Sequence, residues 1–210
     1  MEEFFTLKKD GSYEVVIEKS RFIATCSVVK TEAEAKEFVL RVRKKYPDAT
    51  HNCYAFVTDD GGYSKFSDDG EPGGTAGAPM MNVLKSLSLV NVAVVVTRYF
   101  GGIKLGTGGL VRAYGGCVSS AVESLGRIRL VLSVFAELTL DYDDFSKFSS
   151  FSASRKIKPV SIEYSDCVKV SVAVKKSAYN AFIGDFYDFY NGKAMVRETG
   201  EGFYPEEVNP

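Results

Sequence analysis

The segment Val94–Tyr114, VVVTRYFGGIKLGTGGLVRAY, constrains the fold of this chain more than any other. An apolar run typical of a buried strand ends here in a cation and two aromatic residues. A glycine-dense turn follows and leads into a segment with helix potential. Dense glycine permits unusual backbone angles and close approach of another molecule to the main chain. The segment therefore predicts a central strand, a tight turn and a long helix, in that order.

This turn is also a candidate anion-binding surface. A helix N-terminus presents unpaired N–H groups and partial positive charge, so phosphate binds there readily, and nearby cations add charge-assisted contacts. The residues assigned to the surface are Arg98, Gly101, Gly102, Lys104, Gly106, Thr107, Gly108, Gly109 and Arg112, with Thr107 as the expected N-cap. The turn matches neither a P-loop nor a dinucleotide-binding fingerprint. Glycines that serve packing alone are an equal alternative.

The acidic loop Ser67–Pro79, SDDGEPGGTAGAP, is a second candidate site. Asp68, Asp69 and Glu71 could hold a hard cation such as magnesium, although their spacing does not match an EF-hand. They could instead accept hydrogen bonds from the glycine-rich backbone. Acidic loop residues commonly bond their own backbone in turns, which favours this second, structural interpretation.

His51 is the only histidine of the chain and a candidate general base. Cys53 lies two residues further on, so the two side chains share one face of a predicted strand. A Cys–His nucleophilic pair also needs a group that orients the base, and Asn52 should point to the opposite face. A structural histidine is therefore favoured. The four cysteines form no CxxC pair, and no metal site is expected from them.

Composition excludes a chain-wide basic nucleic-acid binder, because the net charge is −1 and 45% of the residues are apolar. A small excess of cations before Leu130 favours the first half for any phosphate-facing patch. The N-terminal segment Met1–Ser12 lacks the apolar core of a signal peptide, and no apolar run reaches the length of a membrane span. We expect a cytoplasmic protein with no membrane partner.

Periodicity predicts two domains, residues 1–130 and 131–210. The first has predicted strands at Tyr13–Lys19, Phe22–Val29, His51–Thr58 and Val90–Thr97 and helices at Glu32–Tyr46, Pro79–Leu87 and Leu110–Leu125. Thr31 and Glu34 form a predicted capping box, and Asp59–Thr75 is predicted to be a long loop.

The second predicted domain follows the β-α-β-β-α-β order of a ferredoxin-like unit, at Val131–Leu140, Tyr142–Ser154, Lys158–Tyr164, Val168–Val174, Ala178–Tyr190 and Lys193–Thr199.

Four blocks of the first half together resemble the IMPACT/YigZ family: SRFIA at Ser20–Ala24, HNCYA at His51–Ala55, DDGEPGGTAGAP at Asp68–Pro79, and the segment Val94–Tyr114. The second half is similar to the ferredoxin-like domain that follows in bacterial members. The resemblance implies an α+β chain. Its first domain would share the β-α-β fold of a ribosomal-protein domain and of elongation factor G domain IV, and its second would resemble domain V.

The same resemblance implies a link to translation, because eukaryotic relatives regulate translation by competing for a partner of a starvation-sensing kinase. It supplies no catalytic residues to carry over. The leading hypothesis is a translation-linked regulatory or binding protein that contacts RNA, the ribosome or a translation factor, without a cofactor or a resident metal. The sequence carries no signal for the oligomeric state.

Two alternatives stay open. One is a hydrolase that uses a metal on Asp68, Asp69 and Glu71, or His51 as a base. The other is a protein-interaction module that binds no nucleic acid and docks through the aromatic segment Phe182–Tyr190, although those rings also fit the packed side of a helix.

Overall fold

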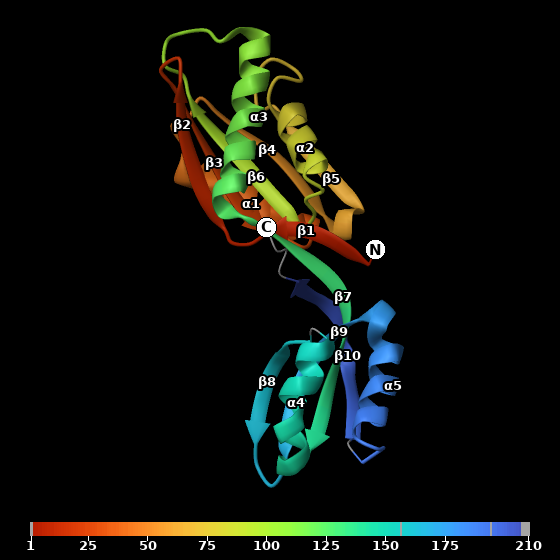
Figure 1. Cartoon of the computed structure of the whole chain (residues 1–210). Helices are drawn as coiled ribbons and strands as arrows, with labels where there is room; N and C mark the ends of the chain where they lie inside the picture. The colour runs from red at the N-terminus through yellow and green to blue at the C-terminus, as the bar shows by residue number, and fades with distance from the viewer. Residues whose placement is uncertain (1, 156, 194, 207–210) are drawn as a thin grey trace. The chain divides into compact units, whose positions relative to one another are not determined.

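The computed structural model describes residues 2–155, 157–193 and 195–206, without the side chain of Asp60. The chain divides into two compact units, Phe4–Arg129 and a second unit formed by Leu130–Glu206 with residues 2 and 3 (Figure 1). Both units combine helices with a sheet, so the predicted α+β class is confirmed. Residues 1 and 207–210 of the predicted domains, and Ala194 of the predicted strand Lys193–Thr199, lie outside the described residues.

The first unit is built on an antiparallel sheet with the order β2-β3-β6-β4-β5. Its strands are β2 (Gly11–Ile17), β3 (Ser20–Val28), β6 (Val92–Tyr99), β4 (His51–Thr58) and β5 (Tyr63–Ser67). The central position of β6 agrees with its apolar sequence, because a strand covered on both faces needs apolar residues on both.

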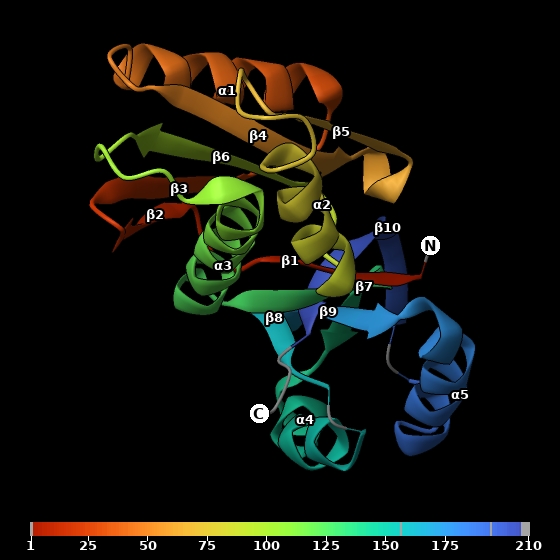
Figure 2. The same ribbon diagram turned by 90° about the horizontal axis from the view of Figure 1, so that it is seen from above.

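Helices cover both faces of this sheet. Figure 2 shows α1 (Glu32–Lys45) on one side and α2 (Gly77–Ser86) and α3 (Gly106–Leu125) on the other. The predicted cap of α1 is confirmed, since the Thr31 hydroxyl accepts a hydrogen bond from the Glu34 N–H at 3.2 Å. The reciprocal bond is shifted by one residue, because Glu34 accepts from the Lys30 N–H at 2.7 Å.

The predicted long loop Asp59–Thr75 was wrong in its first half. The segment contains a short 3-10 helix, η1 (Asp59–Gly61), and the strand β5, which pairs antiparallel with β4. The sequence of β5, YSKFS, is polar and mostly exposed, so no buried face marks it as a strand. Backbone hydrogen bonds to β4 make this segment a strand, although its side-chain pattern does not indicate one. A short first strand, β1 (Glu3–Leu7), was also missed.

The second unit confirms the predicted βαββαβ order. Its elements are β7 (Arg127–Leu140), α4 (Tyr142–Arg155), β8 (Pro159–Tyr164), β9 (Val168–Lys175), η2 (Lys176–Ala178), α5 (Tyr179–Phe189) and β10 (Met195–Glu206). Within this unit the sheet runs β7-β9-β8, and β10 also pairs with β7. Phe148, Phe151 and Phe186 are buried in the core of this unit.

Among the described residues, no helix combines the length and the apolar character that crossing a membrane requires.

Candidate functional site

Three side chains form a row across the sheet of the first unit. Phe22 on β3 and His51 on β4 both stand opposite Arg98 on the central strand β6. The guanidinium carbon of Arg98 lies 5.4 Å from the centre of the Phe22 ring. Arg98 is only 5% exposed, so the structure removes it from the open anion-binding surface expected from sequence. Its guanidinium instead forms contacts inside the protein.

Glu71 of the acidic loop contacts two members of this row, Arg98 and His51. Its Oε1 atom accepts hydrogen bonds from Nη1 of Arg98 at 2.6 Å and from the hydroxyl of Tyr114 on α3 at 2.7 Å. Nε2 of His51 lies 3.9 Å from its Oε2. Glu71 is itself only 7% exposed, so Glu71 and Arg98 form a buried ion pair that is almost completely shielded from water. We call these four side chains the Glu71 network.

Cys53 borders the Glu71 network but does not form a Cys–His nucleophile. Its sulfur lies 2.9 Å from the carbonyl oxygen of Asp68 and 3.4 Å from the Tyr114 hydroxyl. Burial raises the pKa of the Cys53 thiol to about 12, so the thiol is protonated at neutral pH. His51 uses Nδ1 to contact the carbonyl oxygen of Asp69 at 2.8 Å. The structural interpretation of His51 fits this geometry.

The carboxylate of Asp68 organises the acidic loop. It accepts hydrogen bonds from the backbone N–H groups of Gly74, Ala76 and Gly77, at 2.9, 3.0 and 2.8 Å. Partial burial opposes ionisation, but the three N–H groups together outweigh it and hold the pKa of Asp68 below its ordinary value. Asp68 thereby ties the loop to the first turn of α2.

Asp69 contacts β4 and α1. It accepts a hydrogen bond from the Asn52 N–H at 2.7 Å and forms an ion pair with Arg43. Asp68, Asp69 and Glu71 therefore bond three different sets of partners. Across the residues that the structure describes, no group of three or more His, Cys, Asp or Glu side chains is arranged to hold a metal ion.

The glycine turn starts the helix earlier than expected. Helix α3 begins at Gly106, and Leu105 occupies the N-cap position without a side-chain hydrogen bond. The prediction of Thr107 as N-cap was wrong, since it lies inside the first turn. Gly101 serves packing, because a Cβ there would lie 2.0 Å from the carbonyl carbon and oxygen of Lys19. Gly102 adopts a positive φ of 87° that favours glycine.

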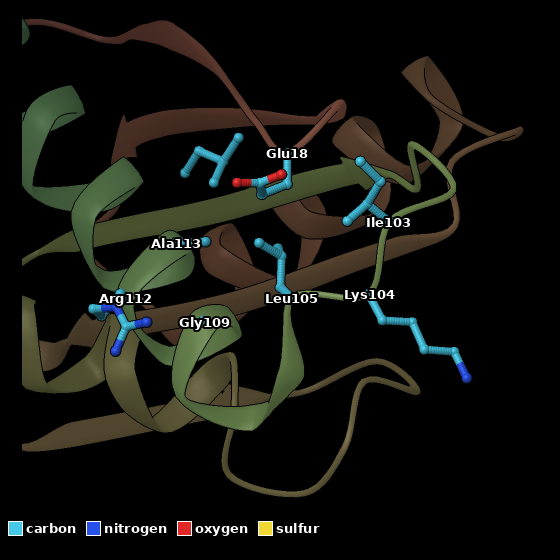
Figure 3. Close-up of a pocket in the computed structure, with 8 residues that line it drawn as sticks. Glu18, Ile103, Lys104, Leu105, Gly109, Arg112 and Ala113 are labelled. Atoms are coloured by element: carbon cyan, nitrogen blue, oxygen red, sulfur yellow. The ribbon is translucent and has the colours of Figure 1, made fainter.

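A cavity of about 430 Å³ opens beside this turn (Figure 3). We call it the groove. It is lined by Ile17, Glu18, Ile103, Lys104, Leu105, Gly109, Arg112 and Ala113. Lys104 and Arg112 are exposed. A Cβ added at Gly108 would lie 3.7 Å from Nη1 of Arg112, which places this cation against the first turn of α3. In Figure 3 the Lys104 side chain extends away from Arg112.

The predicted anion surface is therefore divided by the structure. Lys104, Gly109 and Arg112 line the groove, and Gly102, Gly106, Thr107 and Gly108 are exposed around it, whereas Arg98 joins the Glu71 network. Sequence reasoning missed Tyr114 and Glu18. Glu18 falls in the predicted strand Tyr13–Lys19, whereas β2 ends at Ile17 and Glu18 lies in the turn that follows. Nothing local placed it beside α3.

The aromatic segment Phe182–Tyr190 lies in α5 and the turn that follows it. Phe182, Phe186 and Tyr190 are buried, and the rings of Phe186 and Tyr190 lie 4.8 Å apart. Tyr187 and Phe189 are partly exposed. Most of the segment therefore fills the core of the second unit, which leaves two rings for an aromatic docking surface.

Comparison with known proteins finds two family models on this chain. The Impact N-terminal domain matches residues 18–122, and a domain of unknown function (DUF1949) matches residues 138–193. The first match contains both the Glu71 network and almost all of the groove, with only Ile17 outside it.

Curated proteins and a solved structure match over most of the chain. The IMPACT family member YvyE of Bacillus subtilis is 42% identical over 99% of this chain and 96% of its own length. The IMPACT family member YigZ of Escherichia coli is 38% identical over 86% of this chain and 90% of its own. A crystal structure described as that of a hypothetical protein has 35% identity and a TM-score of 0.61, covering 93% of this chain and 97% of that one.

Eukaryotic proteins match a smaller share of the chain. The protein IMPACT of Rattus norvegicus is 34% identical over 42% of this chain and 29% of its own length.

Proposed function

This chain belongs to the IMPACT family, and from that premise we propose that it is a cytoplasmic, translation-linked regulatory protein that binds RNA phosphates through the groove. Relatives named IMPACT in eukaryotes support the coarser part of the proposal, a regulatory role related to translation. The finer part, RNA as the partner, rests on the chemistry of the groove. RNA bound in this way includes the RNA of the ribosome.

One observation carries the proposal: Arg112 stands beside the uncapped first turn of α3. Among the described residues no side chain caps this helix start, so its first N–H groups are available to an acceptor. Within the part of the chain that the structure describes, neither Arg112 nor Lys104 has a hydrogen bond or an ion pair. A phosphate in the groove would meet a cation and a helix N-terminus together, which is the arrangement that favours anion binding.

The hydrolase alternative receives less support from the geometry. A metal on the acidic loop would have to displace the backbone N–H groups from Asp68 and the Arg98 guanidinium from Glu71. His51 faces Glu71 across 3.9 Å and has no thiolate beside it. The aromatic docking alternative keeps only Tyr187 and Phe189 as exposed rings of α5.

The proposal is tested by measuring the affinity of a fluorescent single-stranded RNA at several salt concentrations. We expect Arg112→Ala and Lys104→Ala to weaken binding at low salt and to reduce the slope of log K against log salt by about 0.7 for each phosphate that the variant no longer neutralises. The matched control is Lys44→Ala, which removes an exposed cation from α1 on the opposite face of the same sheet. Salt slopes that are equal in all four proteins would remove the groove from the proposal.

A translation-factor partner would give a different result. Capture of such a protein from lysate would then survive nuclease treatment, and the isolated RNA would not bind. Loss of the captured material on nuclease treatment is the outcome expected for RNA.

A further inference from the structure

The groove carries an acid opposite its cation. Glu18 lies in the two-residue turn that joins β2 to β3, with a φ of 46°, and Arg112 lies on α3. Figure 3 shows Glu18 and Arg112 on opposite sides of Ala113. Within the residues described, Glu18 forms neither a hydrogen bond nor an ion pair. Both charges are therefore free to meet a ligand.

An unpaired carboxylate is unfavourable in a groove that receives phosphate. It repels every anionic ligand, unless that ligand also presents hydrogen-bond donors to it. A ligand with a phosphate at one end and donors at the other would satisfy both charges. The position of Glu18 thus points to selectivity among anions, beyond the general attraction that Arg112 supplies.

Four side chains of the lining are apolar: Ile17, Ile103, Leu105 and Ala113. They line the space together with Gly109 and three charged side chains, Glu18, Lys104 and Arg112, and Ile103 is 37% exposed. A cavity of about 430 Å³ lies within the range of small-molecule sites. Apolar side chains of this kind can hold the flat face of an unstacked base, as they do in sites that receive a flipped nucleotide.

We propose that the groove holds a guanine base of single-stranded RNA, with Glu18 accepting hydrogen bonds from its N1–H and N2 amino groups and Arg112 contacting an adjacent phosphate. Guanine presents two neighbouring donors that match the two oxygens of a carboxylate. Adenine presents one amino group next to an acceptor, and uracil one donor between two acceptors, so each would bring a lone pair against Glu18. Reading the hydrogen-bonding edge of an unpaired base is the usual mode of sequence recognition in RNA. This inference rests on the proposed RNA-binding function.

The experiment compares heptanucleotides of uridine that carry a single central G, A, C or U, binding to the full chain and to Glu18→Gln. The unaltered protein is expected to bind the G oligomer at least about fivefold more tightly than the A and U oligomers, the low end for a bidentate base contact. In Glu18→Gln, affinity for the G oligomer falls, because the amide offers only one acceptor. Affinity for the U and A oligomers rises, because a repelling charge is gone.

These opposite signs separate base recognition from simple electrostatics. If Glu18→Gln raises the affinity for all four oligomers equally, Glu18 only contributes to the field and the guanine site is overturned, while the proposed RNA binding stands. If no oligomer binds, both are overturned. The matched control is Glu123→Gln, which removes an exposed acid at the other end of α3 and should leave the order of affinities unchanged.

Discussion

Arg98 donates a hydrogen bond from Nη1 to Oε1 of Glu71 at 2.6 Å, and both side chains are almost completely removed from solvent. The contact joins the central strand β6 to the loop that precedes α2. Tyr114 adds α3 through its own hydrogen bond to the same oxygen. One carboxylate thus holds together β6, α3 and the acidic loop, which are distant in the sequence. Because Tyr114 belongs to α3, this contact also helps to position the helix whose first turn lines the groove.

Glu71→Gln is expected to destabilise the protein by about 3–5 kcal/mol, because it leaves the Arg98 charge buried without a counter-charge. Urea unfolding of the purified variant measures the loss. The control is Glu14→Gln, since Glu14 pairs with Arg21 at the exposed surface of the same sheet and such pairs contribute little to stability. Equal losses in the two variants would contradict the role assigned to Glu71.

Asp68 should make stability depend on pH in the acidic range. Its folded-state pKa lies below the ordinary value of 3.8, so the ionised carboxylate stabilises the protein above that pH. The contribution is lost as the pH falls through about 4 towards the lower folded-state pKa. Asp68→Asn is expected to cost about 1–2 kcal/mol at neutral pH, as for a lost helix-start cap, and progressively less on acidification. A difference between the two proteins that stays constant from pH 7 to pH 3 would contradict this.

Three of the four thiols should be inert in the folded protein. Burial raises the pKa of Cys26 and Cys53 to about 12 and that of Cys117 to about 11. Treatment with iodoacetamide at pH 8, followed by mass spectrometry, is expected to label the partly exposed Cys167 alone. The same reagent in denaturant labels all four. Rapid native labelling of Cys53 would reopen a nucleophilic role for that residue.

Two glycine substitutions should act in opposite directions. Gly101→Ala is expected to be strongly destabilising, because the added Cβ would lie 2.0 Å from the Lys19 backbone, which cannot move without shifting the β2–β3 turn. Gly116 lies within α3 with no atom within 4 Å of an added Cβ. Gly116→Ala should therefore stabilise the protein by about 0.5–1 kcal/mol. Thermal unfolding measures both changes, and a neutral Gly101→Ala would refute the close approach.

Local patterns predicted several elements well. The strand His51–Thr58 has the predicted bounds, and the Thr31 cap starts α1 where the sequence placed it. These features depend on residues close in the chain. The strand β5 and the N-cap of α3 were missed because they depend on contacts between distant residues. Pairing with β4 orders the polar segment β5. The glycines at the start of α3 become helical because the later turns of this helix pack against the sheet.

The sequence by itself determined the family and the α+β class, since residue types and local spacing are visible in the chain. It could not decide which of the cations would face a ligand. Arg98 and Arg112 are equally charged in the sequence, yet strand register places one against the buried Glu71 and helix geometry leaves the other at the groove. Burial and pairing arise only when distant segments pack together, because the cost of an isolated charge depends on what surrounds it.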